Sequence, residues 1–588
     1  MSVDEIRPGM EGVGRTVFSG ETPEEFRVHV LGVLRNIVGP QRNLILARLE
    51  GGPLADMGVM QGMSGSPVYV DGRLVGAVSY SLGAFPKAPI AGITPIAEMI
   101  EATAMASGRA ASTRVRLELP LTPERLTAAL RAAMQRVQPF AAEPSTLEVL
   151  GLPRHAGAQL ALQLQPIATP FIMNGVAGVP AEMLHDALRS AGFSPVIGAP
   201  GVAQAPGAAG RTLEPGDAVG VILAGGDFEL GASGTVTFVD GAHVYAFGHP
   251  FFNLGPTRFP MTRAAVYSLL PSFMTSQKIA ALGAIVGTVE QDRATAIAGT
   301  LGEGPALIPI TVSLKSARGY DKRFEFRVVN DEFFTPLLTY LAIANALAGS
   351  ERQIGTATFS VEGTARVAGH EPVRFSDLFS GDNAVVGASS YVASPVTLLM
   401  GNDLEPVRIE AIDLEVKAGE QPLIGTIERV WLDEVRPRAG RTVPLKVLVR
   451  EYGGGERLYT VALTIPPNAP PNVTVLVADA ARMTQWEQRE LQASQRPQSV
   501  SQIIRTLNAQ RRNNRLYVRL LRAGPGAVVN GEPLPALPPS VMSVLEADRE
   551  GGAFARLRSA VLGAWEVSTE RAITGSRTLA ITLEPGRP

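Results

Sequence analysis

The chain has 588 residues, 53 basic and 55 acidic side chains, a net charge of −2 and a hydrophobic content of 45%. This length predicts several domains of roughly 100–200 residues each, and the near-zero net charge gives no electrostatic case for nucleic acid or for an anionic membrane surface. The absence of cysteine excludes disulfides and thiolate metal sites.

Residues 1–105 form a β-rich segment. Apolar or alternating runs predict strands at Phe26–Leu34 and Asn43–Leu49. The Asp71-Gly72 pair between two apolar runs is a strong hairpin signal. A short helix is expected to close the segment at Pro95–Thr103.

The most informative motif of this segment is Gln61-Gly62-Met63-Ser64-Gly65-Ser66-Pro67-Val68. A serine with glycine two residues before it and one after it has the form of a serine-protease nucleophile turn. In such a turn the N–H groups of Gly62 and Ser64 can both point at a developing oxyanion. The alternative is an ordinary glycine-rich turn, in which Ser64 and Ser66 only bind neighbouring backbone groups.

Residues 106–210 have a different pattern and are expected to form an α/β insert. Helical spacing of Leu, Ala and Met covers Thr122–Val137, with Thr122 as N-cap before a proline, and a similar pattern covers Pro180–Ala191. Gly198–Gly210 is rich in Ala, Pro and Gly, which is typical of a linker or loop.

Residues 211–417 return to strand patterns. The run that begins at Gly234, the Asp240-Gly241 pair and the run that begins at His243 predict a second hairpin with the same turn device. An apolar helix is expected at Thr335–Ala348.

The remaining chain is predicted to hold two further regions. Residues 418–478 alternate as in a β-sandwich, with strands expected at Arg429–Leu432, Thr442–Arg450 and Leu458–Ile465. Residues 479–588 form a mixed α/β region, with a helix near Ala480–Ser494 and a last strand at Thr578–Leu583. The basic run at 511–522 is interpreted as a solvated face, because acidic residues elsewhere in this region argue against a nucleic-acid surface.

A serine nucleophile needs an adjacent base, usually histidine. Of the six histidines, His249 is the best candidate, because Gly248 and Pro250 favour a bent backbone at a strand end that can present the imidazole. The other five stand in strand, loop or helix settings without a partner pattern: His29, His155, His185, His243 and His370.

The third member of such a site is a carboxylate that orients the imidazole. Glu50 and Asp56 precede the serine, and Asp240 and Asp292 lie in the histidine-bearing region. Their patterns alone do not rank these four residues.

Two segments of the chain resemble those of a known family. The stretch from Gly58 through the Ser64 motif to Ser79 resembles the nucleophile segment of SpoIVB-type serine peptidases, the sporulation-signalling proteases. The stretch from Gly234 to Pro250 resembles the same family's histidine segment, a strand pair that ends in Gly-His. The resemblance covers residues 1–105 and roughly 211–310.

The resemblance implies a chymotrypsin-like double β-barrel with Ser64 as nucleophile, His249 as general base, and an oxyanion hole from Gly62 and Ser64. The family's acid stands at a strand end upstream of the nucleophile, a position that falls on Glu50 once one loop residue is deleted, with Asp56 as second choice. The resemblance also implies an extracytoplasmic protein, secreted or periplasmic. Met1-Ser2-Val3-Asp4-Glu5 has no signal-peptide character, so a signal is expected to lie outside this sequence.

The chain departs from the family in the order of its segments. In the sporulation protease the histidine segment comes first, whereas here Ser64 precedes His249. Triad geometry does not depend on chain order. The two halves therefore look permuted, and residues 1–105 are expected to pack against residues 211–310 despite the insert.

The sequence thus predicts a mainly β protein with an α/β insert: a double barrel of permuted halves, a β-sandwich-like domain and a mixed C-terminal region. Its predicted function is a serine endopeptidase acting on a protein or peptide substrate, without cofactor, metal, nucleic acid or an integral membrane segment. The alternative is a weakly active or inactive peptidase-fold scaffold that binds protein or cell-envelope partners. An α/β-hydrolase-like esterase is disfavoured, because Ser66 stands where the nucleophile elbow needs glycine. No pattern predicts cleavage specificity or oligomeric state.

Overall fold

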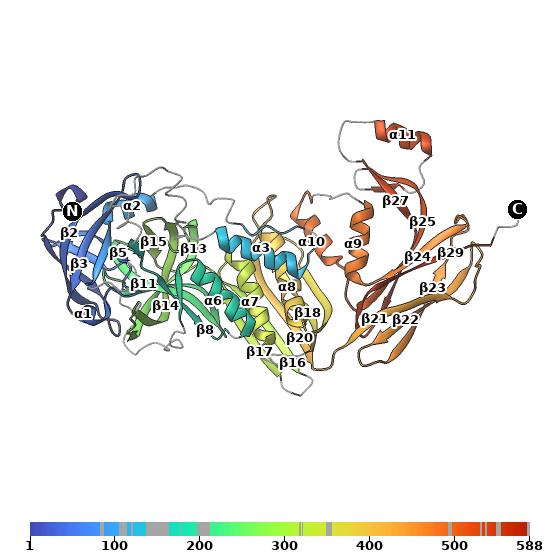
Figure 1. Ribbon diagram of the computed structural model, residues 1–588, viewed down its shortest axis with the longest axis horizontal. Coiled ribbons are helices and arrows are strands. Elements are labelled where there is room, and N and C mark those ends of the chain that lie inside the picture. Colours follow the sequence, from blue (N-terminus) through green and yellow to red (C-terminus); the bar gives the residue numbers. More distant parts are fainter. Residues whose placement is uncertain are drawn as a thin grey trace.

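The fold is taken from a computed structural model, in which α-helices and β-strands are numbered in chain order (Figure 1). The structure describes residues 1–82, 88–104, 114–118, 121–136, 164–176, 178–196, 212–273, 275–316, 319, 321–348, 356–491, 497–529, 532–534, 538–547 and 554–584. The expected loop at Gly198–Gly210 lies outside them.

The first barrel is a closed ring of six antiparallel strands at the N-terminal end of the molecule (Figure 1). Its order is β1 (Glu11–Thr16), β2 (Glu24–Gly39), β3 (Arg42–Glu50), β6 (Ile90–Pro95), β5 (Arg73–Leu82) and β4 (Pro67–Val70). The ring closes because β4 pairs with both β5 and β1. Alternate residues of these strands point inward and fill one apolar core.

Short local elements complete this barrel. Asp71 and Gly72 both have positive φ, 49° and 73°, as the predicted tight hairpin turn between β4 and β5 requires. The 3₁₀ turn η1 (Val3–Glu5) precedes the barrel, α1 (Leu54–Met57) leads to the Ser64 turn, and α2 (Ile96–Ala104) closes the segment where a helix was expected.

The second barrel is another closed ring of six antiparallel strands. Its order is β10 (Ala218–Gly226), β13 (Gly255–Leu270), β14 (Gln277–Arg293), β15 (Ala296–Leu301), β12 (His243–Ala246) and β11 (Glu229–Asp240). Pairing of β10 with β11 closes the ring. The expected pair of β-barrels is therefore confirmed.

The region between the barrels does not stand apart from them. It holds α3 (Pro123–Arg136), β7 (Leu164–Pro166), β8 (Thr169–Asn174), α6 (Gly178–Ser190) and β9 (Phe193–Val196), so both expected helices are present. Strand β7 pairs with β5 of the first barrel, and β8 pairs with β11 of the second. The region thus adds strands to both sheets.

The second barrel continues into a wide helix-covered sheet. Beyond β10 the strand order is β17 (Asp321–Val328), β16 (Ile308–Ser316), β20 (Ile409–Gly419), β18 (Ala357–Val367) and β19 (Val373–Gly381). Helices α7 (Phe334–Ala348) and α8 (Ala384–Met400) pack on this sheet, and their apolar residues join those of α3 in the largest core (Figure 1). Helix α8 was not expected, because its apolar run contains Pro395 and has no polar stripe.

The C-terminal part consists of two sheets that share one apolar core. One sheet has the order β23 (Glu456–Thr464), β22 (Thr442–Glu451), β21 (Ile424–Leu432) and β28 (Ala572–Thr574). The other contains β26 (Glu532–Leu534), β25 (Arg515–Val529), β24 (Asn472–Ala478) and β29 (Ser576–Thr582), with β27 (Phe554–Ser568) also paired to β25. Helices α9 (Ala480–Leu491) and α11 (Pro539–Ala547) complete this part, whereas the apolar residues of α10 (Val500–Asn508) join the core of the preceding helix-covered sheet. The sandwich therefore draws strands from both 418–478 and 479–588.

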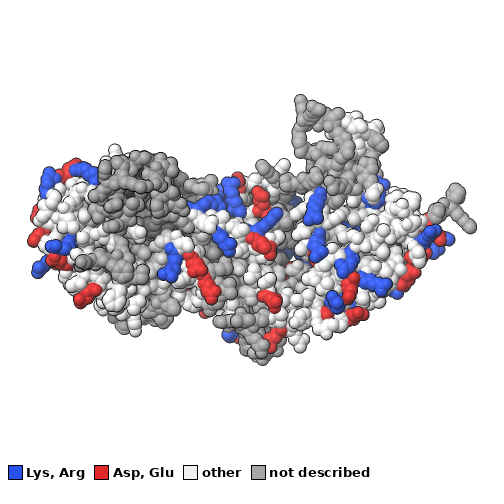
Figure 2. Space-filling model, viewed as in Figure 1, with Lys and Arg blue, Asp and Glu red and all other residues white. Residues whose placement is uncertain are grey.

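Two surface properties bear on possible partners. On the face shown in Figure 2, basic and acidic side chains are interspersed and form no extended single-sign patch. Within the described ranges, no helix combines the length and the apolar character that crossing a bilayer would need.

Candidate active site

The Ser64 turn lies between α1 and β4 and is held by hydrogen bonds to backbone carbonyls. Gly62 and Gly65 have φ of 91° and 95°, a region that favours glycine. The Gly65 N–H donates to the Val78 carbonyl at 2.8 Å, and the Ser66 hydroxyl donates to the Met63 carbonyl at 2.6 Å. Ser66 is therefore the serine that stabilises the turn.

Ser64 has a different environment. Its side chain is fully buried, and its hydroxyl forms no hydrogen bond within the described part of the chain. Nor do the N–H groups of Gly62 and Ser64 donate to any acceptor among the described residues. Buried polar groups are normally satisfied in the resting fold. A hydroxyl and two N–H groups left open in one turn are the groups that acyl transfer requires.

His249 stands in a sharp bend after β12, as its flanking residues predicted. Phe247 and Gly248 both have φ of 72°, so the strand ends abruptly before the histidine. The imidazole is fully buried, and its Nδ1 lies 2.8 Å from the Pro250 carbonyl oxygen. A carbonyl only accepts hydrogen bonds, so Nδ1 carries the proton of the neutral ring and Nε2 has the basic lone pair. Burial lowers the pKa of His249 to about 4, against the opposing effect of the bond to Pro250.

Strand β11 of the second barrel holds the Ser64 turn of the first. The Thr235 N–H donates to the Ser64 carbonyl at 2.8 Å, and its hydroxyl donates to the Gly62 carbonyl at 3.1 Å. The Thr237 hydroxyl donates to the Gly65 carbonyl at 2.7 Å. These three hydrogen bonds fix the turn to β11, which pairs with β12, the strand that precedes His249.

The strand end that carries His249 packs on the same turn. A Cβ at Gly65 would clash with the Thr235 carbonyl oxygen and lie 2.6 Å from the Phe247 nitrogen, and one at Gly248 would lie 2.9 Å from the Ala77 Cβ. The Thr94 hydroxyl donates to the Gly248 carbonyl at 2.8 Å. The predicted packing of residues 1–105 against residues 211–310 is therefore confirmed, and the Ser64 and His249 segments meet at their interface.

Sequence patterns did not reveal Lys278, which lies against this turn. Its N–H donates to the Gln61 carbonyl at 3.0 Å, and a Cβ on Gly62 would lie 3.2 Å from its side chain. The ammonium group is buried and donates to the Thr16 hydroxyl at 2.7 Å. Burial lowers the pKa of Lys278 to about 7. No local motif marked this residue, because its environment arises from strands far apart in sequence.

The four carboxylates considered for the acid lie in different environments. Glu50 is 41% exposed and contacts His29 at 3.2 Å and Arg48 at 2.9 Å. Asp56 lies exposed on α1, and Asp240 lies exposed at the end of β11. Asp292 is fully buried, and its oxygens accept hydrogen bonds from backbone N–H groups that directly follow His249 and Pro250.

The other histidines lie in separate settings. His29 pairs with Glu11 and Glu50, His185 lies near Asp186, His370 pairs with Glu405, His243 is exposed, and His155 lies outside the described residues.

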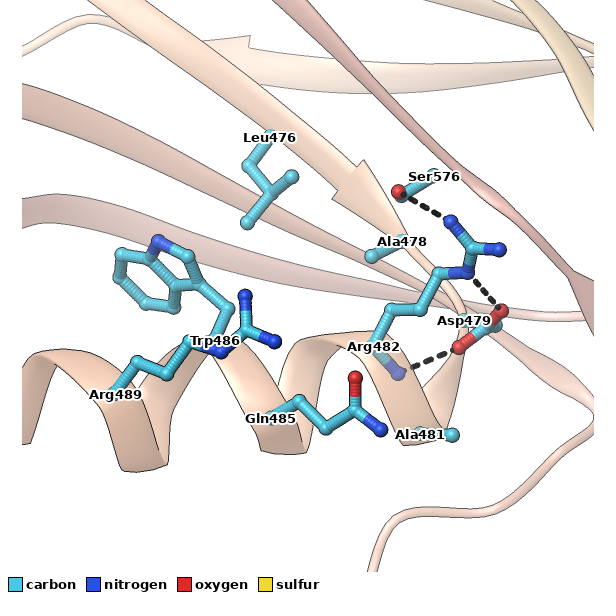
Figure 3. Close-up of a pocket in the computed structure, with 9 residues that line it drawn as sticks. All are labelled: Leu476, Ala478, Asp479, Ala481, Arg482, Gln485, Trp486, Arg489 and Ser576. Atoms are coloured by element: carbon cyan, nitrogen blue, oxygen red, sulfur yellow. Dashed lines mark hydrogen bonds and ion pairs between the residues drawn. The ribbon is translucent and has the colours of Figure 1, made fainter.

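A separate cavity of about 540 Å³ lies between β24 and α9 in the C-terminal part. Figure 3 shows the Arg482 guanidinium between Asp479 and Ser576, with Trp486 further along the helix. The Ser576 hydroxyl accepts from Arg482 at 3.3 Å. No histidine lines this cavity, so the serine and histidine of the barrel interface have no counterpart in it.

Comparison with known proteins supports the family suggested by the sequence. Residues 2–93 match the model of the SpoIVB peptidase S55 family. The matched segment includes Ser64 and ends before the segment that carries His249. No match was found among curated proteins or among solved structures.

The contact between the barrels gives a first prediction. Gly65→Ala places a Cβ against the Thr235 carbonyl in a backbone conformation that L-residues avoid. We expect a loss of about 3 kcal/mol in the free energy of unfolding. Urea unfolding of the variant measures this loss, with Gly72→Ala as control, because Gly72 also has positive φ but an open Cβ position. Equal losses in the two variants would contradict the close contact.

The buried amine gives a second prediction. The pKa of Lys278 is about 7 in the folded chain and 10.5 in a model peptide. Between pH 7 and pH 10.5 the amine is therefore mostly protonated in the unfolded chain and mostly neutral in the folded one. Stability therefore rises with pH in that window, by about 2 kcal/mol from pH 7 to pH 9. Lys278→Met keeps the apolar stem and should remove this rise in urea unfolding measured at both pH values. A pH dependence equal to that of the wild type would show that the amine is not the source.

Proposed function

We propose that this protein is a serine endopeptidase that cleaves peptide bonds through an acyl-enzyme on Ser64, with His249 as general base. The observation that carries the proposal is the packing of the His249 strand end on the Ser64 turn at a junction of two β-barrels. The family match over residues 2–93 supports it, because that family consists of serine peptidases and the match includes Ser64.

The proposed reaction uses the groups of the turn in a fixed order. The Ser64 oxygen attacks the peptide carbonyl while its proton passes to Nε2 of His249. The Gly62 and Ser64 N–H groups stabilise the oxyanion of the tetrahedral intermediate. The C–N bond then breaks as His249 returns the proton to the leaving amine. Water, activated by the same imidazole, hydrolyses the acyl-enzyme and regenerates Ser64.

The burial of the site sets a condition on this reaction. Both Ser64 and His249 are fully inaccessible to solvent, so a peptide reaches them only after the residues that cover them have moved. The same burial favours the alternative function, a peptidase-fold scaffold that binds protein or cell-envelope partners. An extracytoplasmic location stays a prediction under both functions.

A fluorophosphonate probe distinguishes the two functions. We expect covalent labelling of the wild-type chain at Ser64, cleavage of casein, and a loss of both in Ser64→Ala, with activity reduced by about 10³-fold or more. Peptide mapping of the labelled protein identifies the modified serine.

The matched control is Ser268→Ala, an exposed serine on β13 of the second barrel, which should label and cleave as the wild type does. Labelling that persists in Ser64→Ala, or casein cleavage at the wild-type rate in that variant, would contradict the endopeptidase proposal.

A further inference from the structure

Asp292 of β14 is a buried carboxylate whose oxygens bind the loop that follows His249. Oδ1 accepts from the Phe251 N–H at 2.8 Å, and Oδ2 accepts from the Phe252 N–H at 2.7 Å and the Leu254 N–H at 3.2 Å. The three donor residues are themselves buried. Bonds of this kind, from N–H groups to an ionised carboxylate, are short and strong, so the carboxylate fixes the loop closely.

The first of these bonds continues to the imidazole through one peptide group. The Phe251 N–H and the Pro250 carbonyl belong to the same planar unit, and a trans peptide directs its N–H and C=O in opposite directions. Asp292 binds the N–H end at 2.8 Å, and His249 Nδ1 lies 2.8 Å from the carbonyl oxygen at the other end. Carboxylate, peptide and imidazole therefore form one continuous chain of hydrogen bonds.

We propose that Asp292 is the positioning residue of this site, acting on His249 through the Pro250–Phe251 peptide. This inference rests on the proposed function of Ser64 and His249. Hydrogen bonds in a chain polarise one another at low dielectric. The negative charge at the N–H end strengthens the carbonyl as an acceptor for the Nδ1 proton.

This arrangement supplies both functions of a triad acid. The Pro250 carbonyl holds the neutral ring with its proton on Nδ1, which leaves Nε2 as the base toward the serine. When Nε2 takes the serine proton, the imidazolium forms in a buried site, where an uncompensated charge is costly. The carboxylate charge of Asp292, one peptide away, offsets part of that cost. No proton leaves Nδ1 during the cycle.

Glu50, the residue to which the family resemblance assigns the acid, has other partners. Its carboxylate contacts His29 and Arg48 and is partly exposed, whereas His249 is fully buried. The two assignments make opposite predictions for Asp292→Asn and Glu50→Gln, so one pair of variants decides between them.

The test uses ¹⁵N-histidine NMR of the full chain, with the His249 signals assigned from their loss in His249→Gln. In the wild type at neutral pH we expect a protonated Nδ1 and an unprotonated Nε2. In Asp292→Asn the amide keeps one acceptor oxygen and turns an NH₂ group toward a backbone N–H. We therefore expect a mixture of the two tautomers, a kcat 10–100-fold lower on casein-derived peptide, and a KM changed by less than about 3-fold.

Asp331→Asn is the matched control. Asp331 is also buried, and its Oδ1 accepts from the Phe333 and Phe334 N–H groups at 2.9 and 3.0 Å, at the start of α7. Both variants lose a carboxylate that binds backbone N–H groups, so a general loss of stability affects both. Only Asp292→Asn should change the His249 spectrum, and Glu50→Gln should leave that spectrum unchanged.

Three outcomes would overturn the assignment. A wild-type spectrum with the proton on Nε2 refutes it without any variant, so it stays testable even if Asp292→Asn does not fold. Unchanged His249 signals and kcat in Asp292→Asn also refute it, and an effect of Glu50→Gln on both transfers the role to Glu50. If the tautomer depends on Asp292 but fluorophosphonate does not label Ser64, the positioning of His249 is supported and the endopeptidase proposal fails.

Discussion

The structure depends on the main-chain contact between the Ser64 turn and strand β11. Gly65 approaches the Thr235 carbonyl so closely that no side chain fits between them. The carbonyls of Gly62, Ser64 and Gly65 accept hydrogen bonds from Thr235 and Thr237. One of these three hydrogen bonds joins backbone groups, and the other two are donated by short, β-branched threonine side chains, so little rotamer freedom has to be lost. The geometry of the candidate site follows from this contact.

The sequence predicted those features that depend on local chemistry. The Asp-Gly pairs predicted both hairpins, but the two turns differ. Asp71 and Gly72 both have positive φ, whereas Asp240 pairs with His243 at the end of β11 and only Gly241 has positive φ. The glycines beside Ser64 and His249 predicted sharp bends, because few other residues adopt positive φ. Helix α8 was missed, since its buried apolar run has no helical stripe to detect. Lys278 could not be found either, because its burial is a property of packed strands and not of its neighbours in the chain.

The acid shows the limit of sequence reasoning at this site. A search by motif looks for a carboxylate that touches the imidazole, and family likeness pointed to Glu50. In the fold, the buried carboxylate of Asp292 is linked to His249 by two hydrogen bonds through the Pro250–Phe251 peptide unit. Because every residue has a peptide group, the type of residue does not show that its peptide group links two side chains by hydrogen bonds. It is recognised only when the partners of each backbone N–H and C=O are followed one by one.

The short step from β7 to β8 has a consequence for how the closed site can open. Strand β7 ends at Pro166 on the sheet of the first barrel, and β8 begins at Thr169 on the sheet of the second. The two residues between these strands span only a short distance, so they tether the barrels at this edge. The effective concentration of one barrel at the surface of the other is therefore high. If the two barrels separate, the tether makes the motion a hinge about the β7–β8 edge, widest on the opposite side, and the barrels close again without a search for the partner surface.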